Sequence, residues 1–300
     1  WDACSGYHYN DTTLKGFSHT HLSGTGCIDL GDILFRPTTL KPDLTTESIY
    51  QPAAFSHKDE DASAGYYSVV LKEEGIKAEL TVTAHAGMHR YTFPSGKEAS
   101  IIIDLTHLLD NEYIYEAELE QTAANEITGM RRTRGWTDNQ YVYFVAQFSK
   151  PFQTIDFIQN KKMVSAGVKL NGTDLQACLS FDNSNGEPVI AKVGLSIVSE
   201  KNARENLETE VIGFDFDAVR SAARSAWEQA LSAITVKGGN TDDLKNFYTA
   251  MYHSMVVPNV VSDVNGEYRR HNMEIGQLPK GKVQYSTFSL WDTFRAWNPL

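Results

Sequence analysis

The stretch Ile76-Lys77-Ala78-Glu79-Leu80-Thr81-Val82-Thr83 decides the fold, because apolar and polar side chains alternate along it. A period of two sends one row of side chains into a core and the other toward solvent, which is typical of a half-buried β-strand. The same period dominates from about residue 28 to residue 205. Its clearest repeats lie in Ala99–Leu105, Tyr141–Phe148 and Val189–Val198.

Short polar clusters separate these predicted strands. They contain Pro, Gly, Asn and Asp, the residues that turns prefer, and lie at residues 94–97, 171–174 and 182–186. Many strands joined by short turns predict a two-sheet β-sandwich. The region is too long for a seven-strand immunoglobulin unit, so we expect a larger sandwich.

The period then changes. From Asp217 to Leu231 apolar side chains recur every three or four residues, which indicates one face of an α-helix. Asp217 is the expected N-cap, and Gly238-Gly239 ends the unit.

A second helix is predicted directly afterwards. Thr241 is its expected N-cap, its apolar face runs to Met255, and Pro258 closes it. The chain is therefore predicted to be mainly β, with a β-sandwich domain at residues 1–213. Residues 214–300 would hold a linker helix and the start of an all-helical region.

Composition excludes some classes of function. The formal net charge is −11, from 38 acidic and 27 basic residues, which opposes unspecific binding to nucleic acid. No stretch approaches the ~20 apolar residues of a membrane span. Three cysteines are too few for a disulfide framework. The chain starts at Trp1 and stops in a dense aromatic segment, so we expect an internal piece of a longer protein.

The segment Gly16-Phe17-Ser18-His19-Thr20-His21-Leu22-Ser23-Gly24-Thr25-Gly26 is the first candidate site. If it is extended, His19 and His21 point to the same side. Two such rings could bind a metal ion or hydrogen-bond a hydroxylated ligand. Alternatively, both histidines only hold a turn-rich loop.

A second candidate site lies near the end of the chain. Trp291 offers an apolar face to a sugar ring, and Asp292 and Arg295 offer charged hydrogen bonds to vicinal hydroxyls. At helical spacing, Asp292 and Arg295 could instead pair with each other.

Two further polar runs receive structural interpretations. The basic run at residues 131–136 is interpreted as a solvated strand edge or as interdomain ion pairs. The run from Asp104 to Asp110, which includes His107, is interpreted as a strand end with a local turn, because no nucleophile motif accompanies it.

Taken together, these segments resemble glycoside hydrolase family 92. The resemblance rests on Gly16–Gly26, on Asp29-Leu30-Gly31-Asp32-Ile33-Leu34, and on Ser289-Leu290-Trp291-Asp292-Thr293-Phe294-Arg295. Cys4-Ser5-Gly6-Tyr7-His8-Tyr9 and His89-Arg90-Tyr91-Thr92-Phe93-Pro94 look like the same family. The likeness runs in order over essentially the whole chain.

The resemblance implies a β-sandwich followed by an (α/α)6 barrel. It implies an exo-acting α-mannosidase, active in the degradation of N-glycans and other mannose-containing glycans. The implied reaction inverts the anomeric carbon and uses a calcium ion that engages the mannose. The catalytic acid, the catalytic base and most calcium ligands are expected beyond Leu300, so this chain would hold no catalytic residue, and none of its residues is assigned to the metal.

The residues carried over by resemblance are for substrate binding. Trp291, Asp292 and Arg295 would bind the terminal mannose. Trp1, beside Cys4 and Ser5, would lie near the leaving-group sugar, as in members that favour α-1,2 linkages. His19, His21 and Thr25 would support the pocket from the sandwich side.

Two other functions stay open at this point. A glycoside phosphorylase of the same sandwich-plus-barrel plan would release sugar only with phosphate. A carbohydrate-binding protein without catalysis would bind mannose and hydrolyse nothing. By the resemblance we expect a secreted, periplasmic or cell-surface protein; the sequence gives no indication of an oligomeric state.

Overall fold

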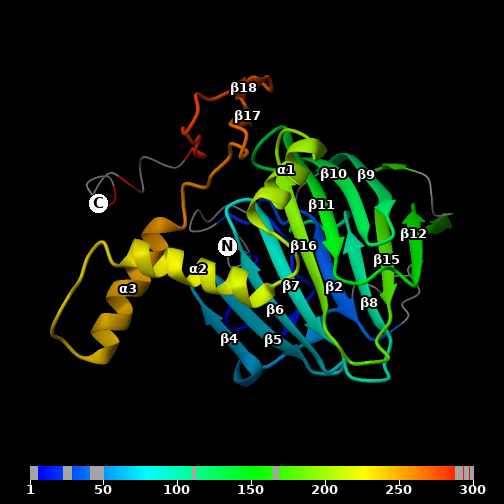
Figure 1. The fold of residues 1–300 in the computed structure, drawn as a ribbon, viewed down its shortest axis with the longest axis horizontal. Coiled ribbons are helices and arrows are strands. Elements are labelled where there is room, and N and C mark those ends of the chain that lie inside the picture. Colours follow the sequence, from blue (N-terminus) through cyan, green and yellow to red (C-terminus); the bar gives the residue numbers. More distant parts are fainter. Residues whose placement is uncertain are drawn as a thin grey trace.

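The computed structural model describes residues 6–22, 29–40, 51–109, 113–164, 169–287, 293 and 297. Its centre is a β-sandwich of two antiparallel sheets (Figure 1). The larger sheet has nine strands, in the spatial order β14 (Leu170–Gly172), β9 (Tyr113–Ala123), β10 (Glu126–Arg134), β11 (Gln140–Phe148), β16 (Val189–Ser196), β7 (Ala86–Thr92), β6 (Ile76–Val82), β5 (Tyr66–Leu71) and β4 (Glu60–Ser63).

The second sheet has five strands, and two small ribbons lie outside the sandwich. Its order is β13 (Lys162–Val164), β12 (Thr154–Gln159), β15 (Leu175–Phe181), β8 (Ala99–Asp104) and β2 (Leu34–Thr38). The ribbons are β1 (Thr13–Leu14) with β3 (Ala53–Ala54), and β17 (Glu267–Arg269) with β18 (Ile275–Gln277). A 3-10 turn spans His57–Asp59.

The main core fills the space between the two sheets. The alternation that starts at Ile76 continues into the structure, because Ile76, Ala78 and Leu80 turn toward this core while Lys77 is exposed. Phe144 and Leu179 are 0% exposed at its centre. The prediction of a mainly β chain with a large two-sheet sandwich followed by helices is confirmed.

In the described part of the chain, three long helices follow the last sandwich strand. They are α1 (Glu200–Glu210), α2 (Phe216–Leu231) and α3 (Thr241–Met255). Figure 1 shows α1 across the outer face of the nine-stranded sheet, while α2 begins against β6 and β7 of that sheet and leads away from it to α3. Continuation of these helices into an (α/α)6 barrel stays a prediction, as does the domain boundary near residue 213, a position between α1 and α2.

The sequence did not predict α1, and it misplaced two caps. The buried face of α1 comprises Ala203 and Leu207 together with two asparagines, so its apolar stripe is too short to detect. Asp215 caps α2 where Asp217 was expected, and Asn240 caps α3 in place of Thr241. The observed caps lie two residues and one residue before the expected ones, and their side chains satisfy free amides of the first turn.

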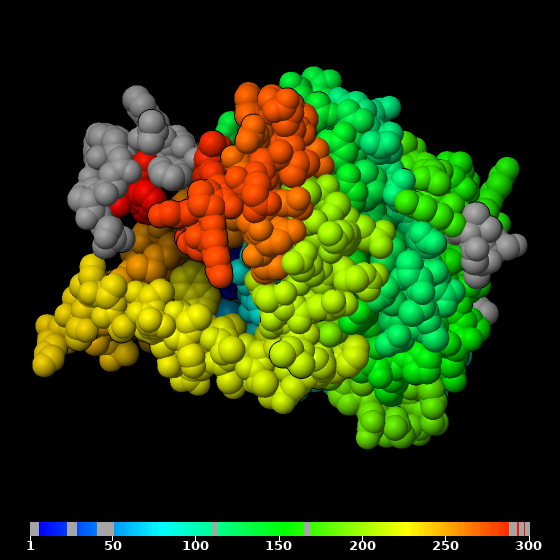
Figure 2. Space-filling model, turned by 45° about the horizontal axis from the view of Figure 1, so that its top comes forward, coloured from blue at the N-terminus to red at the C-terminus, as the bar shows by residue number. Residues whose placement is uncertain are grey.

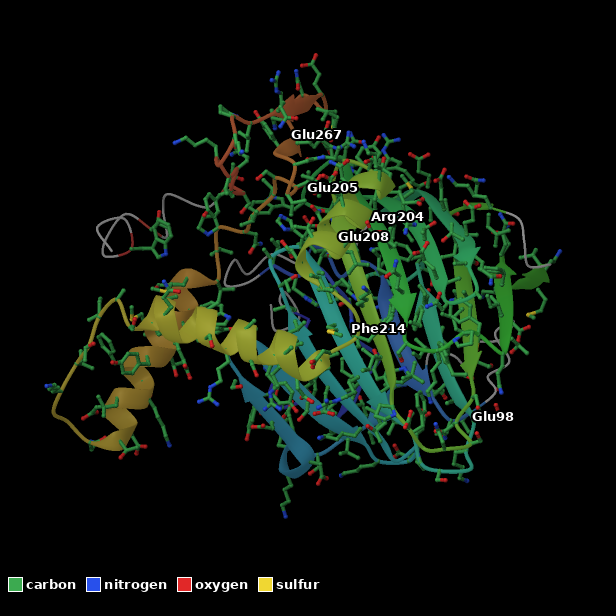
Figure 3. All side chains as sticks on the ribbon, viewed as in Figure 1. Glu98, Arg204, Glu205, Glu208, Phe214 and Glu267 are labelled. Carbon is green, nitrogen blue, oxygen red and sulfur yellow. The ribbon has the colours of Figure 1, made fainter. Side chains whose placement is uncertain are left out.

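Helix α1 approaches β16 closely at Gly194. A Cβ at this position would lie 2.4 Å from the Ala203 carbonyl oxygen and 2.5 Å from Leu207 Cβ. Arg204 on α1 donates two hydrogen bonds, of 2.8 and 2.7 Å, to the Glu126 carboxylate. Figure 3 shows Arg204 on α1, with Glu267 of β17 above the helix. The helix is thus fixed to the sheet, and it supports the chain that follows α3.

Among the described residues, no helix is long and apolar enough to cross a membrane.

Candidate functional site

The segment from Gly16 to Leu22 lies beside the chain that leads into β2. Phe17 and Phe35 exchange backbone hydrogen bonds of 2.8 and 2.9 Å, and the His19 amide donates to the Asp32 carbonyl at 2.9 Å. This pairing keeps the segment extended, with Phe17 turned into the core. His19 and His21 both line one cavity, as the extended pairing predicts.

The cavity has a volume of about 340 Å³ and lies where the sandwich meets the chain after α3. Figure 2 shows it as a hollow between the orange C-terminal segment and the yellow helices, with blue and cyan residues at its floor. Residues 18–21, the turn between β6 and β7, and Val260, Val261 and Asp263 contribute to its walls.

His19 is locked by a directed chain of hydrogen bonds. Its Nδ1 lies 2.7 Å from the Ile33 carbonyl oxygen, which only accepts, so Nδ1 carries the proton. Its bare Nε2 must then accept from His89 Nε2, at 3.0 Å, and His89 Nδ1 accepts from the Tyr91 hydroxyl at 2.7 Å. Both rings are therefore neutral, with every ring nitrogen engaged.

Burial keeps this pair neutral. It lowers the pKa of His19 from 6.5 to about 4, although the Ile33 carbonyl partly opposes the shift. Burial, with the neighbouring His19, holds the pKa of His89 well below its usual range. Neither ring has a free lone pair for a metal ion, so the chemistry of His19 is that of a fixed pocket wall.

His21 differs from His19. Ser18 Oγ lies 2.7 Å from His21 Nε2, and burial lowers the pKa of this ring although Asp32 opposes the shift. A neutral His21 that accepts the Ser18 proton at Nε2 carries its own proton at Nδ1. That N–H is a donor suited to a hydroxylated ligand.

A buried ion pair fixes the base of the segment. Arg131 Nε donates to Asp32 Oδ1 at 2.9 Å, and both side chains are 0% exposed. The other Asp32 oxygen accepts from Thr20 at 2.6 Å and from Gln140 at 2.8 Å. The interpretation of the basic run as a solvated edge is wrong for Arg131, because β10 lies inside the nine-stranded sheet.

Asp263 stands beside the cavity but is occupied. Its carboxylate accepts from Ser196 at 2.7 Å, from Asn202 at 2.8 Å and from Asn206 at 2.7 Å. A carboxylate with three short donors is a structural anchor for the chain after α3. The sequence interpretation missed this anchor, and its only signal is the pair of asparagines four residues apart on α1.

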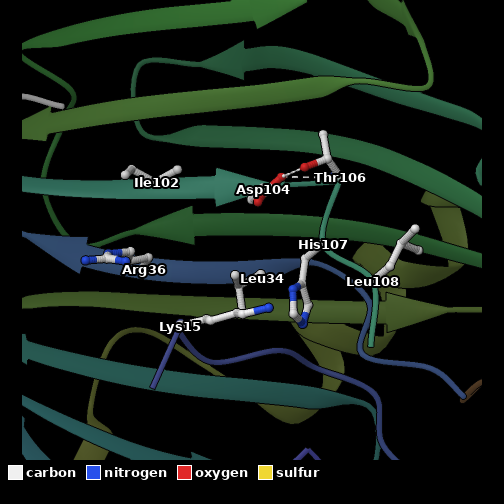
Figure 4. A pocket seen from close by; sticks show the side chains of 8 residues that line it. All are labelled: Lys15, Leu34, Arg36, Ile102, Asp104, Thr106, His107 and Leu108. Carbon is white, nitrogen blue, oxygen red and sulfur yellow. Dashed lines mark hydrogen bonds between the residues drawn. The ribbon is translucent and has the colours of Figure 1, made fainter. Parts of the chain in front are cut away.

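A second cavity, of about 150 Å³, lies on the outer face of the five-stranded sheet (Figure 4). Asp104 accepts from the Thr106 amide and hydroxyl, each at 2.7 Å, which confirms the predicted strand end with a local turn. Burial, Lys15 and Arg131 lower the pKa of His107 to about 4. This cavity shares no residue with the histidine-lined one, and its carboxylate is already bound within the fold.

The other predicted site residues lie outside the described residues. They are Trp1, Cys4, Ser5, Thr25, Trp291, Asp292 and Arg295. Of the predicted site, the structure therefore brings together His19 and His21. The residues that it describes include no group of three or more His, Cys, Asp or Glu side chains placed to hold a metal ion.

Comparisons with known families follow the two parts of the fold. The glycosyl hydrolase family 92 N-terminal domain matches residues 1–196, and the glycosyl hydrolase family 92 catalytic domain matches residues 202–300.

Individual relatives match nearly the whole chain. The chain is 30% identical to an uncharacterized secreted glycosidase of Arthroderma benhamiae, over 98% of this chain and 41% of that protein. A family GH92 alpha-mannosidase from Bacteroides thetaiotaomicron superposes with a TM-score of 0.93 at 38% identity, over 100% of this chain and 41% of that one. Its complex with mannoimidazole gives a TM-score of 0.92 at 38% identity, over 99% and 40%. This chain thus spans about two fifths of these relatives' length.

Proposed function

This chain belongs to glycosyl hydrolase family 92, and we propose that the complete protein is an exo-acting α-mannosidase that removes terminal α-linked mannose from glycans. The observation that carries the proposal is the ordered match of the chain to both family domains, together with 38% identity to an alpha-mannosidase. That enzyme has been solved with mannoimidazole, which supports a mannose-based substrate here.

The proposed reaction inverts the anomeric carbon. Inversion needs a carboxylic acid that protonates the leaving oxygen and a carboxylate that activates water, ~6.5–9.5 Å apart. We assign neither role to a residue of this chain. Its coverage of 41% of the relatives leaves room for both in the rest of the complete protein.

The residues of this chain would shape the mannose pocket. His19 and His89 form a rigid neutral wall, and the His21 ring would meet a sugar hydroxyl. By family resemblance, Trp291, Asp292 and Arg295 would hold the terminal mannose, and Thr25 would support them. Trp1, Cys4 and Ser5 would lie near the leaving-group sugar and favour α-1,2 linkages.

We include a calcium ion in the proposal because the family resemblance implies one. The described residues include no group of three or more His, Cys, Asp or Glu side chains placed to hold a metal ion. By the family resemblance, we expect most calcium ligands in the rest of the complete protein. When bound, a hard cation of this kind would engage vicinal sugar hydroxyls.

We also propose that the protein acts outside the cytoplasm, because a relative at 30% identity is described as secreted.

The test uses the complete protein with α-1,2-, α-1,3- and α-1,6-linked mannobiose. We expect mannose release, fastest for the α-1,2 linkage, with β-mannose as the first anomer in the proton NMR spectrum and loss of activity after chelation by EDTA. Release that requires phosphate would identify a phosphorylase instead. Binding of mannose without release would leave a carbohydrate-binding protein.

A further inference from the structure

His85 lies in the turn between β6 and β7, and its ring contacts two distant parts of the chain. Its Nδ1 lies 2.5 Å from Glu210 Oε1 at the end of α1, 125 residues away. Its Nε2 lies 2.8 Å from the Ser262 carbonyl oxygen, 177 residues away. His85 and Asp263 both line the histidine-lined cavity. The contacts of His85 therefore join the sandwich side of this cavity to the segment of Val260, Val261 and Asp263, which we call its roof.

The Glu210 carboxylate is held firmly in this position. Its second oxygen accepts from the Thr83 hydroxyl at 2.5 Å and from the His85 amide at 2.9 Å. The turn itself is closed by the Thr83 amide, which donates to the Ala86 carbonyl at 2.8 Å. The carboxylate therefore faces the His85 ring in a fixed direction.

Both nitrogens of His85 face hydrogen-bond acceptors. The Ser262 carbonyl has no proton to give, so His85 Nε2 must donate. An ionised Glu210 has no proton either, so Nδ1 must also donate. A neutral imidazole carries one N–H, so both bonds form together only in the imidazolium.

The charged groups that face His85 favour this state. They are Glu210 on α1 and Asp263 on the segment after α3. The turn that carries His85 adds no charged group but supplies the Thr83 hydroxyl, which donates to Glu210. Burial opposes the charge, but the bonds to Glu210 and Ser262 outweigh it and raise the pKa of His85. Burial likewise opposes ionisation of Glu210, and the bonds from His85 and Thr83 lower its pKa.

We propose that protonated His85, Glu210 and the Ser262 carbonyl form a clamp that seats the start of the catalytic domain on the sandwich and holds the cavity roof in place. His85 is thus a positioning residue. The importance of the roof for hydrolysis rests on the proposed function, but the clamp itself does not.

The sign of the pH effect follows from the two groups. The contribution of His85 is complete below its ordinary pKa of 6.5 and is lost as the pH rises through its raised pKa. The contribution of Glu210 is complete above 4.5 and is lost as the pH falls through its lowered pKa. The clamp is therefore complete between pH 4.5 and 6.5 and opens as the pH rises through the raised pKa of His85.

Hydrogen exchange of residues 257–264 in the complete protein tests the clamp. Protection factors, which are corrected for intrinsic exchange, should fall about tenfold to hundredfold as the pH rises through the pKa of His85, the range of one charge-assisted hydrogen bond. His85→Gln should show low protection at every pH. The control His271→Gln, at an exposed position on the ribbon of β17 and β18, should follow the wild type.

Glu210→Gln separates the clamp from simple packing. The new amide can donate to Nδ1 of a neutral His85, so both bonds survive without the imidazolium. Protection of residues 257–264 should then persist as the pH rises through the range in which the wild type loses it. Equal pH dependence in the wild type and Glu210→Gln would overturn the proposal, even if His85→Gln fails to fold. No substrate is needed, so failure of the mannosidase assay would not affect the result.

Discussion

The β-sandwich buries its apolar side chains between its own sheets, whereas α2 and α3 bury few of theirs. The sandwich encloses residues such as Ile101 and Phe144 completely between its own sheets. In the described part of the chain, α2 buries one side chain, Phe216, and α3 buries one, Met251. Helical stability comes mainly from packing of an amphipathic face. An apolar stripe therefore indicates that a helix has a packing partner, but does not say that the partner lies nearby in sequence.

The small number of buried side chains on α2 and α3 agrees with the share of its relatives' length that this chain covers. Residues 202–300 match a catalytic domain, yet the chain covers 41% of its relatives. We infer that the outward faces of α2 and α3 pack against the rest of that domain in the complete protein.

The largest expected effect is a difference in local stability within this chain. Amides of β11 should exchange only through global unfolding, whereas amides of α3 should open locally. We expect a gap of about 5 kcal/mol or more, or about four powers of ten in protection factor. Hydrogen exchange with mass spectrometry measures both regions in one experiment. Equal protection of β11 and α3 in the 300-residue chain would break the comparison, and a gap that narrows in the complete protein would sharpen it.

The next effect concerns the ion pair that fixes the signature segment to the sandwich. Arg131→Met leaves Asp32 buried without its cation, which should lower the free energy of unfolding by about 3–5 kcal/mol. Arg134→Met is the matched control on the same strand, because Arg134 is 60% exposed and its partner Asp138 is 86% exposed. That change should cost less than about 1 kcal/mol. Urea denaturation of both variants measures the two losses of stability. Equal midpoints for Arg131→Met and Arg134→Met would show that the buried pair contributes nothing.

Arg131 also shows what the sequence could and could not predict. The period of two places Ile127, Gly129 and Arg131 on one face of β10, but both faces of this strand are buried from Glu126 to Arg131, so alternation alone did not show that Arg131 is buried. Its pairing with Asp32 could not be predicted either, because 99 residues separate the two. Alternation predicts which face a residue takes, but long-range pairing depends on strand order, which local patterns do not encode.

In the candidate site, too, one feature could be predicted from the local sequence and another could not. That His19 and His21 share one side followed from the extended segment alone. The roles of the two rings did not, since they depend on Ile33, His89 and Ser18, which only the fold brings together. Helix α1 was missed because asparagines fill half of its buried face, and an apolar periodicity does not register them.

A smaller effect tests how α1 is attached to the sandwich. Gly194→Ala places a Cβ against the backbone of α1, where the Ala203 carbonyl cannot move away cheaply. Overpacking of this kind should cost about 1–3 kcal/mol of unfolding free energy. Gly172→Ala is the control, because its Cβ would meet the flexible end of Gln159 at 3.0 Å. Thermal unfolding of the two variants measures the difference, and a Gly194→Ala variant as stable as the control would contradict the close docking of α1.

The smallest expected effect is on the pH dependence of the free energy of unfolding. It comes from His19 in the sandwich and not from the helices. Because the pKa of His19 falls from 6.5 to about 4 on folding, the unfolded chain takes up a proton in this range that the folded chain refuses. Stability should therefore fall as the pH falls, and His19 should account for about 1 kcal/mol between pH 6.5 and about 5.5. His19→Gln should remove that part of the slope in urea titrations. His253→Gln, at an exposed position on α3, should keep it. If both variants retain the wild-type slope, the hydrogen-bonded pair of His19 and His89 is not held neutral, and its description as a fixed pocket wall fails.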